Sequence, residues 1–259
     1  MLRKVVLIGS GNLAEALAAA LGASGAELLQ IYGRNAARVA LLAARAGAAA
    51  CTDPAALERT ADLYLIAVSD RAVAEVAAQL PIPATAVVAH TAGSVPLDAL
   101  ARFPRRAILY PLQSFTAGRR VDFRRVPLFL ECADEALRPE LEAFARTLSE
   151  EVRYADSARR ATIHLAGVFA NNFANRMFGL AAEVLRREGL PYEVLKPLIE
   201  ETAAKAAAAA DPAAVQTGPA VRGDCASQER HLKLLEGLPL EKAIYELTSQ
   251  SIWETSKKI

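Results

Sequence analysis

Three polar side chains lie in a stretch of sequence that is otherwise mostly apolar. His164, Asn171 and Asn175 lie between Ser157 and Glu188, where the absence of proline predicts one long helix. Offsets of seven and eleven residues, at about 100° per residue, bring all three onto one face. A histidine can donate a proton near neutral pH, and two carboxamides can hold a polarised oxygen or nitrogen.

Either these polar groups bond to protein or they face a cavity, because buried polar groups without partners are costly. A single helical histidine is more often structural than catalytic, so the structural interpretation stays open. We expect His164, Asn171 and Asn175 to be catalytic, with His164 as the general acid. Asn172 lies beside the same face and is expected to contact the substrate.

A glycine-rich turn near the start of the chain fits a dinucleotide. The run Gly9-Ser10-Gly11-Asn12-Leu13-Ala14 matches G-x-G-x-x-A, and it follows an apolar strand and opens a helix. Gly9 permits a tight turn and Gly11 lets the backbone approach a pyrophosphate. The free N–H groups of the helix N-terminus then bind the anion. The cofactor contacts expected from this loop are Gly9, Ser10, Gly11, Asn12 and Leu13.

The end of the second expected strand favours a phosphorylated dinucleotide. An NAD site usually has an acidic residue there to hold the ribose hydroxyls. This strand ends in Tyr32-Gly33-Arg34-Asn35, without an acid, and the Arg34 guanidinium suits a phosphate. We therefore expect NADP(H) as the cofactor. The alternative is that Arg34 is a solvated turn residue.

Other polar residues follow strands at their carboxyl ends, where ligands of open α/β sheets bind. Ser69 or Asp70 is expected to cap the next helix. Val68, Ser69, Asp70 and Thr91 are expected cofactor contacts, and His90, Gln113, Thr217 and Arg222 are expected substrate contacts. The Arg222 guanidinium can bind a carboxylate bidentately or lie at a helix C-terminus instead.

The elements that must position these residues alternate regularly in the first part of the chain. Expected strands are Leu2–Ile8, Leu28–Tyr32, Ala48–Cys51, Leu63–Val68, Thr85–His90, Ala107–Tyr110 and Leu128–Leu130. Expected helices between them are Leu13–Leu21, Ala36–Ala46 and one that begins with Pro54–Arg59. This order predicts an α/β, doubly wound parallel sheet of Rossmann type.

Past Asp156 only helices are expected. They are Ser157–Glu188, Glu193–Ala209, Ala226–Leu235 and Leu240–Ser256, with a loop over Asp211–Asp224. We therefore expect an NADP-binding Rossmann domain over residues 1–154 and an all-α domain over residues 155–259. Gly189 is expected at the end of the long helix, and Asp224 is expected to cap a later one.

Six segments taken together resemble a known family. They are Gly9–Asn12, Ser69-Asp70, His90–Ser94, Tyr110–Phe115, His164–Asn175 and Gln216–Asp224. In this order they resemble the Rossmann-like proteins whose C-terminal half is the domain of unknown function 2520. The chain is more distantly similar to pyrroline-5-carboxylate reductases and to β-hydroxyacid dehydrogenases, including ketopantoate reductase.

The resemblance implies an NADP-binding domain and a helical dimerisation domain like that of 6-phosphogluconate dehydrogenase, with a substrate cleft between them. In one respect the chain departs from these relatives. The β-hydroxyacid dehydrogenases place a catalytic lysine on the long helix, and residues 157–188 contain no lysine. Their mechanism therefore does not transfer directly.

Composition excludes several classes of protein. Hydrophobic residues make up 53% of the 259, and 30 basic against 29 acidic residues give a net charge of +1. That balance argues against nucleic-acid binding, and no apolar run reaches the ~20 residues that span a bilayer. Cys51, Cys132 and Cys225 have no metal-ligand or disulfide spacing, so we expect no metal and a cytoplasmic location.

Together these features favour an NADP(H)-dependent oxidoreductase that reduces a small carbonyl or imine acid and acts as a homodimer. One alternative is a non-catalytic NADPH-binding sensor or partner-binding protein, which the missing lysine supports. Another is a cleft that binds a metabolite only for regulation.

Overall fold

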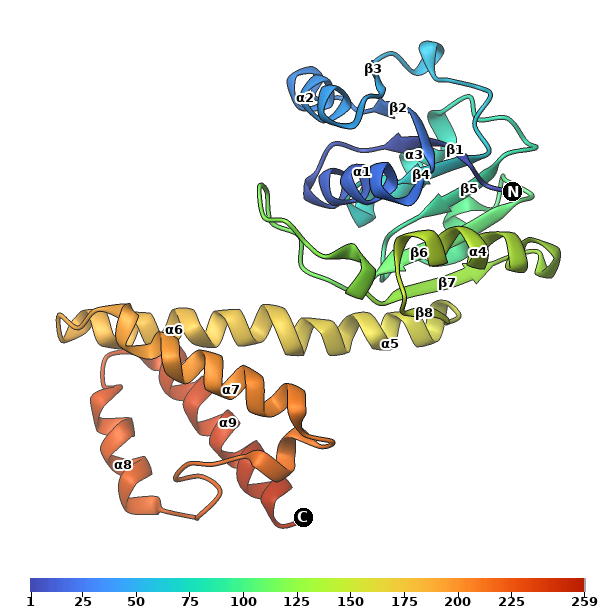
Figure 1. Cartoon of the computed structure of the whole chain (residues 1–259). Helices are drawn as coiled ribbons and strands as arrows, with labels where there is room; N and C mark the ends of the chain where they lie inside the picture. Colours follow the sequence, from blue (N-terminus) through green and yellow to red (C-terminus); the bar gives the residue numbers. More distant parts are fainter. Residues whose placement is uncertain (259) are drawn as a thin grey trace. The chain divides into compact units, whose positions relative to one another are not determined.

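The computed structural model describes residues 1–258. Its eight-stranded sheet has the order β3-β2-β1-β4-β5-β6-β7-β8 (Figure 1). The strands are β1 (Lys4–Ile8), β2 (Glu27–Tyr32), β3 (Ala49–Cys51), β4 (Leu63–Ile66), β5 (Val87–His90), β6 (Arg106–Pro111), β7 (Leu128–Cys132) and β8 (Val152–Tyr154). The α/β Rossmann prediction is confirmed, because the order reverses at β1 and β4 as in other doubly wound sheets.

Two details of the sheet differ from the prediction. Strand β7 runs antiparallel to β6, so the sheet is not wholly parallel, and β8 was not expected. The connection from β6 to β7 contains no α-helix, only the short 3₁₀ turn Phe123–Arg125. A parallel pair needs a long crossover, usually helical, so the two neighbours pair antiparallel.

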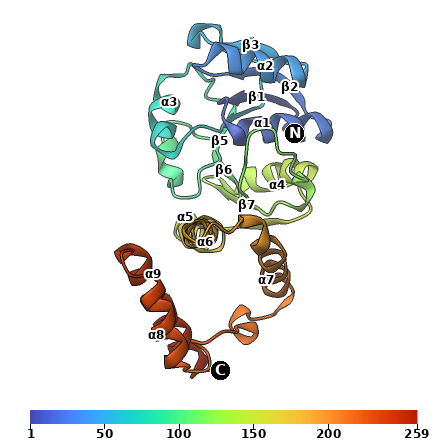
Figure 2. The same ribbon diagram turned by 90° about the vertical axis from the view of Figure 1, so that its left-hand side faces the viewer.

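Helices cover both faces of the sheet because side chains alternate along each strand. Val5 and Leu7 belong to the core formed with α1 (Asn12–Ser24), α2 (Ala36–Ala46) and α4 (Arg138–Leu148). Val6 and Ile8 belong to the core on the other face, with α3 (Val73–Gln79). Figure 2 shows α3 on one side of the sheet and α1 and α4 on the other.

The helix expected to begin with Pro54–Arg59 is only a 3₁₀ turn, Pro54–Ala56. Asp53 caps it by accepting a hydrogen bond from Ala55 N at 2.9 Å. The Gln30 carboxamide forms hydrogen bonds with two backbone groups that a longer helix would pair within itself. Its Nε2 donates to Ala56 O at 3.1 Å, and its Oε1 accepts from Glu58 N at 2.9 Å.

The long helical segment is interrupted by a wider turn. Helix α5 (Ser157–Gly167) is followed by a π-helical stretch, Val168–Phe173, and then by α6 (Ala174–Arg187). A π-helix bonds residue i to i+5, so each residue turns less than 100°. The assumption of a uniform 100° rotation, which placed His164 and Asn171 on one face, is therefore wrong over this stretch.

The chain divides into two compact units, the first running from Met1 to Phe173 and the second from Ala174 onward. The second unit contains α6, α7 (Lys196–Ala208), α8 (Cys225–Leu234) and α9 (Pro239–Ser256). Asp224 caps α8 and Gly189 ends α6 with φ of +68°, both as expected. Across residues 1–258, no helix combines the length and apolar character needed to cross a membrane.

Candidate active site

The phosphate loop lies between β1 and α1 and has the shape that an anion needs. Gly9 has φ of +135°, and a Cβ there would lie 2.2 Å from the carbonyl oxygen of Ala67, so only glycine fits. A Cβ at Gly11 would meet nothing within 4 Å, and no side chain caps the N-terminus of α1. Asn35 caps α2, by contrast. The first N–H groups of α1 are therefore left for a ligand.

Two arginines flank this loop on the side of β2. Arg34, which follows β2, is exposed, and Gly33 beside it approaches Ser10 closely. Arg38, which the sequence analysis did not single out, donates from Nε to Ser10 O at 3.2 Å and pairs with Glu15 at 2.5 Å. The signal that could have found Arg38 is its spacing of four from Arg34, on the first turn of a helix.

The side chains of Asn12 and Leu13 leave the loop in other directions. Asn12 donates from Nδ2 to Phe115 O at 3.2 Å, which ties the loop to the segment after β6. Leu13 is half-buried against the core below α1. Gln113, in the segment tied down by Asn12, is exposed, and its Oε1 accepts from Ser114 N at 2.7 Å.

A hydrogen bond between side chains links the segments that follow β4 and β5. Ser94 donates from its hydroxyl to the Asp70 carboxylate at 2.5 Å. Ser69 stands at the N-cap position of the 3₁₀ turn Asp70–Ala72, as predicted, but its side chain makes no capping hydrogen bond, and Asp70 is engaged by Ser94. Ser69 is exposed and Val68 half-buried at this edge.

The side chains of Thr91 and His90 form hydrogen bonds with other parts of the protein. The Thr91 hydroxyl donates to Ile66 O at 3.3 Å. His90 is fully buried: Nδ1 accepts from Ala92 N at 3.2 Å, and Nε2 lies 3.4 Å from Pro96 O. Burial lowers the pKa of His90 to about 4, so the ring is neutral at pH 7. Its ring has no surface open to a substrate and instead shapes the loop after β5.

His164 lies against the same loop from the side of α5. Its Nδ1 is 3.2 Å from the hydroxyl oxygen of Tyr110, at the end of β6. The two rings meet edge to face, with centroids 6.1 Å apart and an interplanar angle of 64°. A Cβ at Gly93 would lie 2.7 Å from Nδ1 and 2.8 Å from Tyr110 Cζ. The absence of a side chain at Gly93 therefore allows the two rings to approach each other.

Tyr110 was not among the predicted site residues, although its motif was noted. It stands at the carboxyl end of β6, which is parallel to β5, so its side chain reaches the same edge as the residues after His90. A tyrosine at the end of an inner strand is the signal that could have indicated it. Burial raises the pKa of Tyr110, so the phenol stays protonated at pH 7.

Arg160, one helical turn before His164, fixes α5 to the sheet. Its side chain is 1% exposed, forms an ion pair with Glu131 on β7 and donates to Val95 O at 2.5 Å. Ser157 adds hydrogen bonds to both Arg160 and Glu131. The Arg160 Nε is buried without a partner among residues 1–258. These contacts hold the helix in the position that places His164 beside Tyr110.

The remaining predicted residues are exposed. Asn171 and Asn172 lie in the π-helical stretch of the first unit. Asn175, Thr217 and Arg222 belong to the second unit and are exposed there. The structure therefore groups His164 with the loop after β5, and it leaves the predicted roles of these five residues as predictions.

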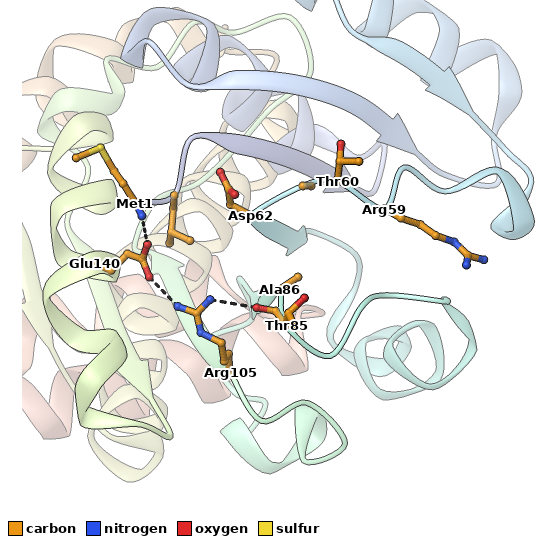
Figure 3. Close-up of a pocket in the computed structure, with 10 residues that line it drawn as sticks. Met1, Arg59, Thr60, Asp62, Thr85, Ala86, Arg105 and Glu140 are labelled. Atoms are coloured by element: carbon orange, nitrogen blue, oxygen red, sulfur yellow. Dashed lines mark hydrogen bonds and ion pairs between the residues drawn. The ribbon is translucent and has the colours of Figure 1, made fainter.

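A separate hollow lies at the opposite edge of the sheet. It is lined by residues that precede β1, β4, β5 and β6, together with Glu140 of α4 (Figure 3). Arg105 donates to Glu140 at 2.7 Å and to Thr85 O at 3.1 Å, and Glu140 also pairs with the Met1 amino group. Glu140 is thus paired with two positive groups, and we assign this hollow a structural role.

Sequence comparisons identify both parts of the chain. Residues 4–93 match the family described as NADP oxidoreductase coenzyme F420-dependent, and residues 126–252 match the domain of unknown function 2520. A proposed NADP oxidoreductase from Bacteroides fragilis is 40% identical, with a TM-score of 0.90 over 97% of this chain and 98% of that one. The chain belongs to the Rossmann-like proteins with a domain of unknown function 2520. This membership confirms the resemblance seen in the motifs.

More distant structures share the fold of this DUF2520-family protein. An imine reductase from Myxococcus stipitatus, in complex with NADP⁺, is 18% identical, with a TM-score of 0.65 over 98% of this chain and 94% of that one. A pyrroline-5-carboxylate reductase from Coxiella burnetii is 16% identical, with a TM-score of 0.56 over 100% and 98%. No curated protein matches the chain.

Proposed function

We propose that the protein is an NADP(H)-dependent oxidoreductase that reduces a small carbonyl or imine acid. The observation that carries this proposal is the uncapped N-terminus of α1. Beside it, Gly9 lies close to the backbone of Ala67, after β4, and there is open space at Gly11. Membership in a family whose Bacteroides fragilis relative is described as a proposed NADP oxidoreductase supports it. The imine and pyrroline-5-carboxylate reductases that share the fold suggest the substrate class.

The loop residues fit the cofactor. The free N–H groups of α1 would hold the diphosphate, and Arg34 would hold the 2′-phosphate, with Arg38 beside it. Arg38 is already paired with Glu15, so the exposed Arg34 has the guanidinium more available to a new anion. Bound NADPH supplies a hydride, and the protein must then provide a proton and orient the substrate.

His164 is the group we assign to proton donation. It lies beside the carboxyl ends of β5 and β6, the edge at which ligands of this fold bind. Asn171 and Asn175 would hold the polarised oxygen or nitrogen. Asn172, Gln113, Thr217 and Arg222 would contact the rest of the substrate, with Arg222 suited to its carboxylate.

Calorimetry with NADPH and NADH tests the cofactor assignment. We expect NADPH to bind at least about tenfold more tightly than NADH, and Arg34→Ala to remove most of that preference. Arg59→Ala is the matched control, because Arg59 lies at the opposite edge of the sheet and should leave both affinities unchanged. Absence of binding to either dinucleotide contradicts the proposal.

A panel of 2-oxo acids and cyclic imines tests the reaction. Oxidation of NADPH, followed by absorbance, is expected with at least one member, and His164→Ala should lower turnover about 10²–10⁴-fold. The alternative is a sensor that binds NADPH without oxidising it, which the lack of lysine in residues 157–188 favours. Tight binding without oxidation across the panel would support the sensor.

A further inference from the structure

The Tyr110 hydroxyl contacts Nδ1 of the His164 ring and does not contact Nε2. The phenol oxygen lies 3.2 Å from Nδ1, whereas Nε2 has no hydrogen-bond partner among residues 1–258 and is not sealed from solvent. We propose that Tyr110 is a positioning residue, which engages Nδ1 of His164 so that Nε2 alone exchanges a proton with the substrate. The proposal rests on the proposed function, because it assumes that a substrate atom is reduced beside this ring.

The contact is built into the fold. Gly93 provides the space, since a Cβ there would approach Nδ1 and the phenol ring to within 2.7 to 2.9 Å. The buried Arg160 fixes α5 from the other end by its ion pair with Glu131. Tyr110 itself is held on β6, packed against Phe129 with ring centroids 6.3 Å apart. Both partners of the hydrogen bond are therefore anchored independently of each other.

The surroundings keep Tyr110 in its neutral form. Burial raises the pKa of the phenol most, Asp70 at the β4 edge raises it further, and Arg160 on α5 lowers it by less than either. A neutral phenol can act as donor or acceptor, because its O–H rotates. It can therefore accept from Nδ1–H both in the imidazolium and in the neutral imidazole that remains after Nε2 gives up its proton. Nδ1 stays engaged in both charge states.

The proposed step transfers one hydride and one proton to the substrate. Hydride addition from the reduced nicotinamide to the substrate carbon moves the electron pair of the C=O or C=N bond onto oxygen or nitrogen. That atom takes the Nε2 proton, so the Nε2–H bond breaks and an O–H or N–H bond forms. His164 changes from imidazolium to neutral imidazole, with its remaining Nδ1–H donated to the Tyr110 oxygen. Solvent then returns the proton to Nε2.

Tyr110→Phe tests the proposal because it removes one oxygen and keeps the ring. We expect kcat to fall about tenfold or more, less than the loss from His164→Ala, with the affinity for NADPH unchanged. The solvent isotope effect on kcat should rise, because proton transfer becomes slower. Tyr64→Phe is the control: Tyr64 is also buried and donates to Glu58 O at 2.5 Å, so it reports the loss of a tyrosine hydroxyl elsewhere.

A double-mutant cycle separates positioning from general destabilisation. If Tyr110 acts through His164, Tyr110→Phe should have no further effect on kcat in the His164→Ala background. Gly93→Ala should reproduce the loss without removing either functional group, while Gly22→Ala, where a Cβ meets nothing within 4 Å, should not. Equal effects of Tyr110→Phe in both backgrounds, or full activity of Gly93→Ala, would overturn the proposal.

A measurement without turnover distinguishes failure of this proposal from failure of the proposed function. In the ¹⁵N spectrum of the His164 imidazole, Tyr110→Phe should shift the Nδ1 resonance and leave Nε2 nearly unchanged. An unshifted Nδ1 overturns the positioning role whatever the activity. If Nδ1 shifts but the wild-type protein oxidises no NADPH with any substrate, the contact stands and the proposed reaction is wrong.

Discussion

At the scale of single residues, the two histidines at the ligand edge have opposite environments. His164 keeps Nε2 open, whereas His90 is fully buried with both nitrogens facing protein. Burial is the largest cause that lowers the pKa of His90 to about 4, and the Arg160 charge adds to it, against smaller opposing effects of Pro96 O and Asp70. His90 must therefore remain neutral in the folded protein at physiological pH.

The burial of His90 predicts that the stability of the protein depends on pH. Between pH 6.5 and about 4 the unfolded chain binds a proton at His90 that the folded chain does not. The free energy of unfolding should therefore fall as the pH drops through this window, by up to about 3 kcal/mol from His90. Urea unfolding at several pH values measures it.

His90→Asn provides the comparison for that experiment. It should lower stability at pH 7 but show a shallower dependence on pH than the wild type. His231→Asn is the control, since His231 is exposed and, within residues 1–258, its side chain bonds to Tyr245 alone, and it should retain the wild-type slope. Parallel curves for the wild type and His90→Asn would show that His90 titrates normally in the folded state.

At the scale of elements, the buried Arg160 joins α5 to the sheet by its ion pair with Glu131. Arg160→Met would leave the Glu131 carboxylate, 17% exposed, without its partner and Val95 O without its donor. We expect a loss of about 3 kcal/mol in the free energy of unfolding. Adding Glu131→Leu should recover part of it, because removing both charges costs less than removing one.

Arg124→Met is the matched control for this prediction. The paired side chains of Arg124 and Glu150 are 55% and 67% exposed. Loss of this pair should therefore lower the free energy of unfolding by less than about 1 kcal/mol. Chemical denaturation of the four proteins gives the comparison. Equal stabilities of Arg160→Met and Arg124→Met would mean that the buried pair does not anchor α5.

At the scale of the whole molecule, we expect a homodimer. Leu165, Phe169 and Phe173 follow each other at intervals of four residues and are 55%, 62% and 46% exposed. A row of large apolar side chains on one helix is unusual on a monomer surface. Phe169→Glu should place a charge in this row and shift the protein from dimer to monomer in sedimentation at micromolar concentration.

Leu41→Glu serves as the control for the oligomer experiment. Leu41 is also exposed, at 43%, but lies on α2, outside that row. Its replacement should leave the sedimentation coefficient unchanged. A wild-type protein that sediments as a monomer at micromolar concentration would exclude the dimer at that concentration.

The sequence by itself determined the elements and the loop that define the fold. The alternation of apolar runs with helical stretches predicted seven of the strands, and the glycines of Gly9–Asn12 predicted the turn before α1, because both features depend on local spacing. The same local reasoning predicted the capping of α8 by Asp224. It failed where a residue far along the chain competes for the same group, as Gln30 does after Pro54 and Ser94 does at Asp70.

Only the tertiary structure decided which polar residues meet. Tyr110 and His164 are 54 positions apart, and their contact depends on the pairing of β5 with β6 and on the absence of a side chain at Gly93. The burial of His90 and the pairing of Arg160 with Glu131 likewise follow from packing between strands and a later helix. No local spacing encodes these contacts, because each joins segments that approach only when the sheet is assembled.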